Sequence, residues 1–513
     1  AIYRADLNDF NWNMISSAGE ALFQVMGLRS SDNTYVNASW GRQGHHFSTP
    51  YGLYLEGPMC YDIFPRIYLA DAIEKGYVGQ FNAEMSEAMD RGAITSLFMQ
   101  SPWGELPSGG RSAHHQWNEA EQCVIFEIYA ARAEDAGNPV LAAAYKRAAH
   151  LSLASMFRWV RPSGEMQIVK NWVDPASRYA YEGYSYHSQY NLLPTAMLAM
   201  AYEHAATSED VSEGASPADT GGFVFAIDRL DIPNRPHKIF ANAGGTYVEI
   251  NSFHDGGYDA IGLVRVHQPG LPPQVGLTDS LIAGAAYNSP VDSPITTGAG
   301  VSWQNASGVW QTLGAMTSSQ VTSIVLTPIS QSTSEVVFDV TYSGSLPNAT
   351  SIVEHYVVTP AGVQVTTQVN GYSGPLRYHW PVLSNDGKTT NSINVSGNTV
   401  SVSQGGPKAT FTATGAQSVS VGGTDYSNHN GWARIATAEY PSGGAISLVI
   451  SQAEATFETS YWKGDVDGNW NTNNAGNTNW ASDAAGTIDG GGVPGLGNDL
   501  VFSAAGATNA ANT

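Results

Sequence analysis

Basic residues are scarce in this chain of 513 residues. Lysine and arginine number 23 against 45 aspartate and glutamate residues, which gives a formal net charge of −22 at pH 7. This balance argues against nucleic acid and anionic membrane surfaces as partners, because both attract basic protein faces. Any anionic substrate must therefore be held by a few local cations, and not by the field of the whole protein.

Long apolar runs and cysteines are also scarce. No apolar run reaches the roughly 20 residues that cross a bilayer, so we expect no membrane insertion. The two cysteines, Cys60 and Cys123, lie in apolar helical contexts, where buried free thiols are usual. The chain starts at Ala1 without a signal-like segment, which we interpret as a processed form or a fragment.

Few lysines and many Asn, Thr, Ser, Gly and Tyr residues are typical of secreted carbohydrate-active proteins. We therefore expect a secreted, cell-surface or periplasmic protein of bacterial type. The sequence leaves its oligomeric state open.

The chain divides into segments of different periodicity. In residues 1–206, apolar positions recur about every 3.6 residues, which predicts a helical domain. Residues 207–221 have linker composition, and residues 222–458 consist of short alternating segments typical of a large antiparallel β-sandwich. The expected helices cover residues 9–26, 57–75, 80–99, 115–136, 139–160 and 187–206.

The tail, residues 459–513, differs again in composition. Its Trp, Gly and Asn pattern, with NWNTN, NTNW and LVFS, resembles one unit of the autotransporter-associated β-strand repeats. The run Asp465-Val-Asp467-Gly468 begins like a calcium loop, but the remaining ligands and the closing Glu are missing. We interpret the tail as the start of a strand-rich surface array outside the catalytic machinery.

The connections between the expected helices alternate in length, and the long ones cover residues 27–56, 100–114 and 161–186. In an up-and-down helical array every second connection lies on the same side. We therefore expect the long loops, all rich in aromatic and polar residues, to share one sugar-sized cleft. The loop side chains expected to bind substrate there are Trp40, Arg42, His46, Trp103, Arg111, Arg178, Tyr181 and Tyr186.

The stretch SPWGELPSGGRSAHHQWNEAEQ, residues 101–122, is the most polar helix entrance in the chain. Its helix begins with His114, His115, Gln116, Asn118 and Glu119. Burying these groups without partners would be costly, whereas active sites often present loop residues on a rigid helix. The alternative interpretation is a well-capped surface helix whose first turn is solvated.

A second group of polar and aromatic residues lies in YAYEGYSYHSQYN, residues 179–191. If a helix begins near Tyr186, then His187, Tyr190 and Asn191 share one face, with Tyr184 just before it. Aromatic packing between helices is the alternative. Five tyrosines within twelve residues, interleaved with His, Glu and Asn, favour a functional site.

A helical array with one polar face, followed by a β-sandwich, resembles the (α/α)-toroid polysaccharide lyases. These include the heparinase II/III-like, alginate lyase and chondroitin/hyaluronate lyase groups. The matching motifs are HHQWNE at 114–119, YSYH at 184–187 and YN at 190–191, and they are not specific to one group. The architectural resemblance covers about residues 1–457. Six expected helices are fewer than the ten or more of those toroids, so the helical domain is either short or incomplete at its N-terminus.

The resemblance implies β-elimination on a uronate-containing polysaccharide without a cofactor. Asn118 and Gln116 would bind the uronate carboxylate, with Arg111 or Arg178 in support. Tyr184 or Tyr190, together with His187 and His115, would supply the base and the acid. The sequence does not choose between the two tyrosines.

Two other functions compete with this interpretation. A glycoside hydrolase on the same scaffold needs two carboxylates across the scissile bond, for which Glu56, Glu105, Glu119 and Glu182 are candidates. A non-catalytic glycan-binding surface protein is the second alternative. Only the lyase would release products with a conjugated double bond.

Metal binding is not expected at the tandem histidine pairs, because adjacent side chains point to different sides of a strand or helix. A structural divalent metal in the β-sandwich could use His237, His254, Asp255 and His267, but histidines near surface turns are the favoured interpretation.

Overall fold

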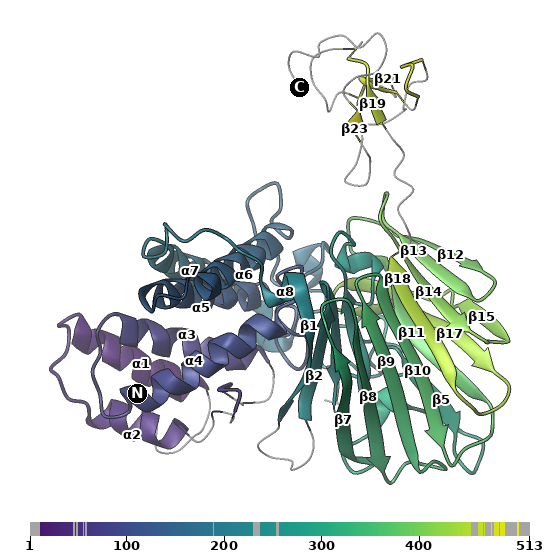
Figure 1. The fold of residues 1–513 in the computed structure, drawn as a ribbon, viewed down its shortest axis with the longest axis horizontal. Helices are drawn as coiled ribbons and strands as arrows, with labels where there is room; N and C mark the ends of the chain where they lie inside the picture. The colour runs from purple at the N-terminus through teal and green to yellow at the C-terminus, as the bar shows by residue number, and fades with distance from the viewer. Residues whose placement is uncertain are drawn as a thin grey trace.

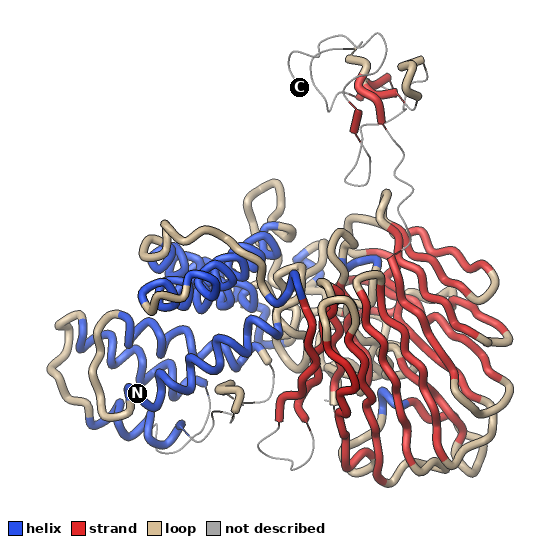
Figure 2. The backbone as a smooth tube through the Cα atoms, viewed as in Figure 1, coloured by secondary structure: helices blue, strands red, loops and turns tan. Residues whose placement is uncertain are grey.

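The structure is a computed structural model of the 513-residue chain. It describes residues 11–44, 47, 50–54, 56, 59–187, 189–228, 236–252, 256–452, 460–464, 466, 473–474, 477–481, 483–487 and 500–501. A helical region is followed by a large antiparallel sheet region, which confirms the predicted fold class (Figure 1). Figure 2 shows the long helices in one half of the molecule and the long strands in the other.

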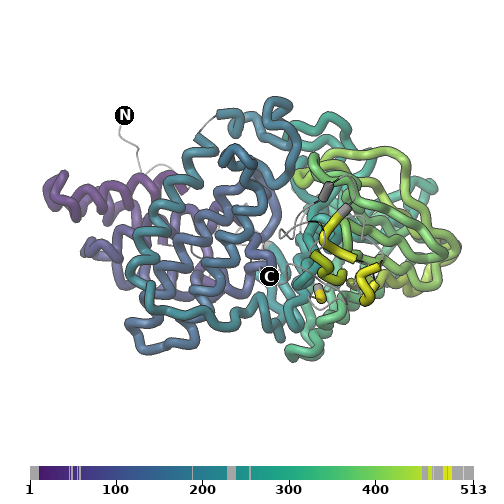
Figure 3. The backbone as a smooth tube through the Cα atoms, turned by 90° about the horizontal axis from the view of Figure 1, so that it is seen from above, coloured from purple at the N-terminus to yellow at the C-terminus, as the bar shows by residue number. Residues whose placement is uncertain are grey.

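The helices of the described residues begin and end close to the expected positions, with two additions, α2 and α8. They are α1 (Asn11–Val25), α2 (Thr34–Gln43), α3 (Cys60–Glu74), α4 (Asn82–Met99), α5 (Trp117–Asp135), α6 (Pro139–Phe157), α7 (Gln189–Ala205) and the short α8 (Pro217–Thr220). The start of α6 follows the sequence signal, because the Asn138 side chain accepts a hydrogen bond from the Leu141 N–H and Pro139 occupies the first turn. Helix α5 packs against α3, α6 and α7, and Figure 3 shows the helices side by side next to the sandwich.

Helix α2 lies where the sequence predicted a loop, and that prediction is wrong. Its residues, TYVNASWGRQ, are mostly polar, so its short apolar face gives little periodic signal. Trp40 lies on that face and is fully buried, with its Nε1 donating to Ser17 Oγ at 3.1 Å. Trp40 therefore belongs to the helical core, and its predicted place in a cleft is also wrong.

The described residues of the β-region form three antiparallel sheets. The first has the order β1-β2-β3-β4, with β1 Gly221–Asp228, β2 Pro236–Ala243, β3 Thr246–Asn251 and β4 Gly262–His267. The second has the order β12-β13-β14-β18-β10-β9-β8-β7, with β7 Val321–Gln331, β8 Val336–Gly344, β9 Ser351–Thr359, β10 Gly362–Asn370, β12 Ser392–Ser396, β13 Thr399–Ser403, β14 Lys408–Thr414 and β18 Ile446–Gln452. The third has the order β15-β17-β11-β5-β6, with β16 beside β17; these strands are β5 Gly300–Gln304, β6 Trp310–Thr312, β11 Leu376–Asn385, β15 Ser418–Val421, β16 Tyr426–Asn428 and β17 Gly431–Tyr440.

The sandwich core follows the alternation that the sequence predicted. Along β8 and β9, buried side chains alternate with partly exposed ones, as expected for strands with one face in a core. One continuous apolar cluster joins all three sheets, with Trp303 and Trp380 among its fully buried members. Strands β3 and β4 are instead buried at every position, because the first sheet lies between the sandwich and the helices.

Buried ion pairs join the helical region to the first sheet. Arg265 on β4 donates to the Leu106 carbonyl at 2.8 Å and lies 3.7 Å from the Glu105 carboxylate. The same carboxylate lies 3.8 Å from Lys170 Nζ. Buried charges of this kind are stable only when paired, so these contacts fix the 100–116 connection against the β-region.

The described part of the tail forms short strands: β19 (Ser460–Trp462), β20 (Asn473–Asn474), β21 (Asn477–Thr478), β22 (Trp480–Ala481) and β23 (Leu500–Val501). Trp462 and Trp480 pack edge to face there, with ring centroids 5.2 Å apart. Among all the described residues, no helix has the length and apolar character of a membrane span.

Candidate functional site

An open cleft of about 540 Å³ lies on the helical region, a volume typical of small-molecule and saccharide sites. It is lined by Asn11, Trp12, Glu56, Tyr61, Phe64, Arg111, Tyr184 and Tyr190. Glu56, Arg111 and Tyr184 come from three different connections between helices. Among the described lining residues, Arg111 is the one cation and Glu56 the one carboxylate.

Arg111 is held at the rim of this cleft but remains accessible. Its Nη2 lies 3.3 Å from Glu56 Oε1, and its guanidinium lies 4.8 Å from the Tyr61 ring centroid. The Glu56 carboxylate also accepts two hydrogen bonds from Asn11 Nδ2, at 2.7 and 2.8 Å. Because the Arg111 side chain is 44% exposed, a ligand carboxylate can approach its free edge.

Ser112 connects the cleft to the layer beneath it. Its Oγ lies 2.6 Å from the Tyr184 hydroxyl and 3.1 Å from the Tyr61 hydroxyl. Its N–H donates to Glu182 Oε1 at 2.8 Å, and its carbonyl accepts from Asn118 Nδ2 at 2.9 Å. Ser112 has a φ of 64°, which is uncommon for a residue other than glycine, so these contacts hold a strained backbone in place.

A buried histidine–carboxylate pair lies behind Ser112. His115 Nε2 is 2.7 Å from Glu182 Oε2, and His115 Nδ1 accepts from Trp117 Nε1 at 3.2 Å. The His115 proton therefore lies on Nε2, toward the carboxylate. Burial alone would raise the pKa of Glu182, but His115 and the Ser112 N–H lower that pKa to about 2.

The cleft tyrosines differ in the charges beside them. Burial raises the pKa of Tyr61 and of Tyr184, and it raises that of Tyr190 to about 12. At Tyr184 the negative charge of Glu182 raises the pKa further. The Ser112 hydroxyl lowers the pKa of both Tyr61 and Tyr184, and at Tyr61 the Arg111 guanidinium lowers it as well, without offsetting the effect of burial.

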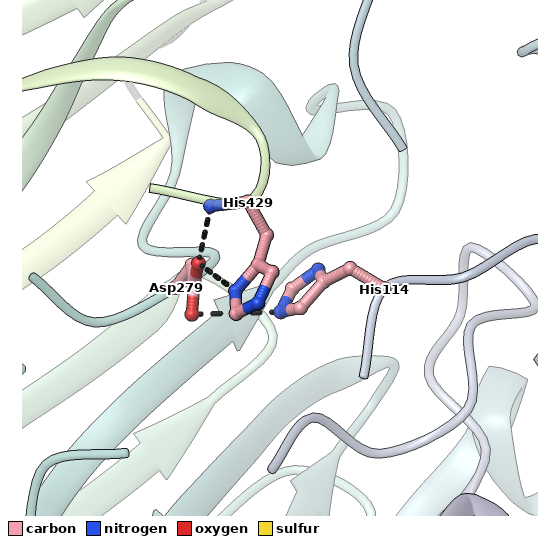
Figure 4. A group of neighbouring side chains, drawn as sticks. All are labelled: His114, Asp279 and His429. Atoms are coloured by element: carbon pink, nitrogen blue, oxygen red, sulfur yellow. Dashed lines mark hydrogen bonds and ion pairs between the residues drawn. The ribbon is translucent and has the colours of Figure 1, made fainter. Parts of the chain in front are cut away.

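A second cluster lies on the other side of the same connection and faces the β-region (Figure 4). The His114 ring stacks on His429 with centroids 4.9 Å apart, and His114 Nε2 lies 3.5 Å from Asp279 Oδ1. Asp279 Oδ2 is 3.0 Å from both His429 Nδ1 and the His429 backbone nitrogen. Nδ1 of His114 and Nε2 of His429 are buried without a hydrogen-bond partner among the described residues, and His114 Nε2 has only its 3.5 Å contact with Asp279.

Two imidazoles and a carboxylate are a donor set that suits a divalent ion such as Zn²⁺. One donor atom from each of His114, Asp279 and His429 lies within 4.8 Å of the others. Zinc bonds of about 2.0–2.2 Å would require the rings to turn inward. Burial lowers the pKa of His114 to about 4, which leaves this ring neutral and able to bind a metal.

The structure brings some of the predicted site residues together. Arg111, Tyr184 and Tyr190 line the cleft, and His115 lies beneath it with its ring edge-to-face against Tyr190, at 5.7 Å between centroids. Asn118 is buried and bonded to Ser112, so it does not line the cleft. Their chemical roles stay predictions.

Other predicted substrate-binding residues lie elsewhere. Glu119 is buried and accepts from Lys170 Nζ at 2.6 Å, and Trp103 donates to the Gln268 carbonyl at 2.9 Å. Gln116 is buried, with neither amide atom hydrogen-bonded among the described residues. The prediction that these three residues and His114 lie at the cleft is wrong. Their side chains pack at the junction with the β-region or beneath the helix entrance.

The remaining predicted residues lie outside the cleft lining. The Arg178 guanidinium lies 4.5 Å from the Tyr186 ring centroid, and Tyr181 is buried with its backbone bonded to Asn288. Arg42 and His187 are exposed, Asn191 is half-buried on α7, and His46 lies outside the described residues.

The sequence did not predict Tyr61 and Ser112 at the cleft, or Asp279 and His429 beside His114, and it also missed Asn11, Trp12 and Phe64 of the cleft lining. Tyr61 follows the apolar pattern of α3, and nothing in the sequence places Asp279 and His429 beside His114. Of the metal candidates in the β-region, His267 is buried next to Thr278, at 3.4 Å. His254, Asp255 and the His237 side chain lie outside what the structure describes.

Comparisons with known proteins give little. No family model and no curated protein match the chain. The likeness of the tail to autotransporter-associated repeats therefore has no support. Among solved structures, it is similar to the heparan sulfate lyase HepC from Pedobacter heparinus (10% identity over 91% of this chain and 72% of that one, TM-score 0.35). It is also similar to the baculovirus envelope protein ODV-E66, a chondroitin lyase (9% identity over 88% of this chain and 77% of that one, TM-score 0.25). A third similar structure is a 4-alpha-glucanotransferase from Thermococcus litoralis (7% identity over 66% of this chain and 50% of that one, TM-score 0.34). Likenesses this weak do not determine the activity.

Proposed function

We propose that the protein is a polysaccharide lyase that cleaves an acidic, uronate-containing polymer by β-elimination. The observation that supports this proposal is the convergence of Arg111 with the Tyr61 and Tyr184 side chains in one open cleft. This set contains a cation for the uronate carboxylate and phenols for proton transfer. In a chain with a net charge of −22, such a local cation is what an anionic substrate requires.

The reaction needs charge stabilisation first. The C5 proton of a uronate is only weakly acidic until the adjacent carboxylate is neutralised. Arg111 can bind that carboxylate and stabilise the negative charge that moves into it as the proton leaves. Arg111 thus takes the role that the sequence suggested for Asn118 and Gln116, because it is exposed at the cleft and they are buried.

Proton transfer is the second requirement. Tyr61, which lies beside Arg111, acts as the base toward C5, and Tyr184 protonates the departing O4. Burial raises the pKa of both tyrosines, but Arg111 opposes this effect at Tyr61 whereas Glu182 adds to it at Tyr184, a difference that supports such a division of roles. The His115–Glu182 pair supports both by holding the backbone N–H of Ser112, whose Oγ contacts the two tyrosine hydroxyls.

A glycoside hydrolase is less well supported. It needs two carboxylates across the scissile bond. Among the described cleft residues, Glu56 is the one carboxylate, and it is already bonded to Asn11 and paired with Arg111. Glu182 lies behind Ser112, with both oxygens in hydrogen bonds.

The test is to incubate the protein with alginate, polygalacturonate, hyaluronan, chondroitin sulfate and heparan sulfate. A lyase gives products that absorb in the near ultraviolet because of the new conjugated double bond. New reducing ends without that absorbance would support a hydrolase. Binding of these polymers without any product would support a non-catalytic glycan-binding protein, and either result would refute the lyase proposal.

A further inference from the structure

The Ser112 hydroxyl bridges two cleft tyrosines that line the same pocket. Its Oγ lies 3.1 Å from the Tyr61 hydroxyl and 2.6 Å from the Tyr184 hydroxyl, and the Ser112 side chain is buried. Two phenols that share one hydrogen-bond partner are close enough to reach neighbouring atoms of a single sugar ring. The C5 proton and the O4 leaving group of a uronate are on such neighbouring atoms.

We propose that Ser112 is a proton relay that makes Tyr61 and Tyr184 one acid–base unit, an inference that rests on the proposed lyase function. Tyr61 takes the C5 proton while its own hydroxyl proton passes to Ser112 Oγ. The Ser112 proton passes to Tyr184, whose hydroxyl proton goes to O4 of the leaving sugar. The C5–H electron pair becomes the C4–C5 double bond, and the C4–O4 pair leaves with O4.

This relay solves a problem that the buried tyrosines would otherwise have. A tyrosine acting alone as a base must first lose its proton, and burial makes the phenolate unfavourable at both positions. In the relay each residue gains one proton as it gives one away, so Tyr61, Ser112 and Tyr184 are neutral before and after the reaction. Rotation of the three hydroxyl groups restores the starting hydrogen-bond direction.

The surroundings of Ser112 hold its hydroxyl at one position. Its N–H is bonded to Glu182 and its carbonyl to Asn118, at 2.8 and 2.9 Å. The backbone at φ 64° would suit glycine better, yet a serine occupies it. A side chain retained at a conformational cost is consistent with a role for its hydroxyl.

The test uses Ser112→Gly, which removes the hydroxyl and suits the left-handed backbone, so that the fold is retained. On the polymer that the wild-type protein cleaves best, we expect kcat to fall about 10²-fold or more, as for loss of a proton-transfer group, with KM nearly unchanged. The residual rate should increase with pH, because it now requires a phenolate. The wild-type solvent isotope effect should show several protons in transfer, and this signature should be lost in the variant.

Two further variants complete the experiment. Ser185→Ala is the matched control, because Ser185 is a buried serine next to Tyr184 whose Oγ donates to the Glu182 carbonyl at 2.9 Å. It should retain wild-type kinetics. Tyr61→Phe should lose as much activity as Ser112→Gly, and the double variant should lose no more than either alone.

The outcomes separate this inference from the proposed function. If the wild-type protein makes unsaturated product and Ser112→Gly keeps its kcat, pH profile and isotope effect, the relay is wrong while the lyase proposal stands. A lower kcat with an unchanged pH profile and isotope effect would also overturn the relay, because it would reduce Ser112 to a structural role. If no polymer gives unsaturated product, the lyase proposal fails and the relay fails with it.

Discussion

The two sides of the 100–116 connection show how one loop can serve an open site and a closed one. On one side, Arg111 reaches an open cleft and is 44% exposed. On the other, His114 is buried against Asp279 and His429 of the β-region. Ser112 and His114 both have left-handed backbones, with φ of 64° and 61°, which accompany the change of direction between the two sides.

The difference lies in solvent access, and this determines what each side can do. A polymer can reach the open side, where Arg111 and the tyrosine hydroxyls lie. On the closed side, His114 Nδ1 and His429 Nε2 have no hydrogen-bond partner among the described residues, and both rings are buried away from a polymer. We therefore expect changes on the open side to affect turnover and changes on the closed side to affect stability.

Arg111→Ala should produce the largest effect. We expect kcat/KM to fall about 10³-fold, because the uronate carboxylate loses its cation in the transition state. Arg111→Lys should lose only about tenfold, because it keeps the charge but not the planar fork. Initial rates followed by ultraviolet absorbance measure both, with unchanged thermal melts as the folding control. Near-wild-type rates in Arg111→Ala would contradict the assignment of the open side.

Asn118→Ala tests the layer beneath the cleft. We expect kcat to fall on the order of 10²-fold, because the Ser112 carbonyl loses the Asn118 amide that fixes it. Asn118→Asp should be at least as damaging, since a carboxylate cannot donate this hydrogen bond. The Asn118→Ala/Ser112→Gly double variant distinguishes the roles. If the fold-decreases in kcat of the two single variants do not multiply in the double variant, Asn118 acts through Ser112. If they multiply, the predicted role of Asn118 as a direct carboxylate ligand is restored.

The sequence predicted much of the fold because its periodic signals were long. The apolar recurrence of α5 and α6 and the alternation of β8 and β9 each extend over many residues. Helix α2 was missed because it is short and polar, and its buried tryptophan looked like a cleft residue. Local patterns do not show which apolar side chain a neighbouring helix will cover.

The site was predicted only in part, for a similar reason. The loop with Arg111 and the segment with Tyr184 and Tyr190 were recognised from unusual local composition. Which of the loop residues would face solvent depends on the backbone at Ser112 and His114, and no residue type there signals φ above zero. Asp279 and His429 are distant in the chain, so their place beside His114 follows from topology alone.

Glu354 is a titratable residue deep in the sandwich, away from both the open and the closed side of the 100–116 connection. Its Oε2 accepts from the Tyr356 and Tyr342 hydroxyls at 2.7 and 3.1 Å, and burial raises its pKa to about 7. Between the unfolded pKa of 4.5 and about pH 7, the folded state holds the extra proton, so stability should fall as pH rises.

Glu354→Gln should remove this pH dependence. It should raise the free energy of unfolding by roughly 2 kcal/mol at pH 8 relative to the wild type, with a smaller difference at pH 5. Denaturant titrations at both pH values measure the change, and catalytic turnover should stay as in the wild type. An equal effect at both pH values would show that Glu354 is ionised in the folded protein.

The smallest effect is expected on the closed side, from addition of zinc to metal-depleted protein. If Zn²⁺ binds His114, Asp279 and His429 in the folded state alone, a free concentration ten times the Kd stabilises the fold by about 1.4 kcal/mol. The increase should be absent in His429→Ala and retained in Arg111→Ala, because only the first removes a donor. It should also weaken as the pH falls, since Asp279 raises the pKa of His429 against the effect of burial and protons then compete with the metal.

Thermal melts with and without Zn²⁺, at two pH values, measure these changes. An equal increase in His429→Ala would place the metal elsewhere, and no increase in the wild-type protein would leave this side of the loop with a packing role only.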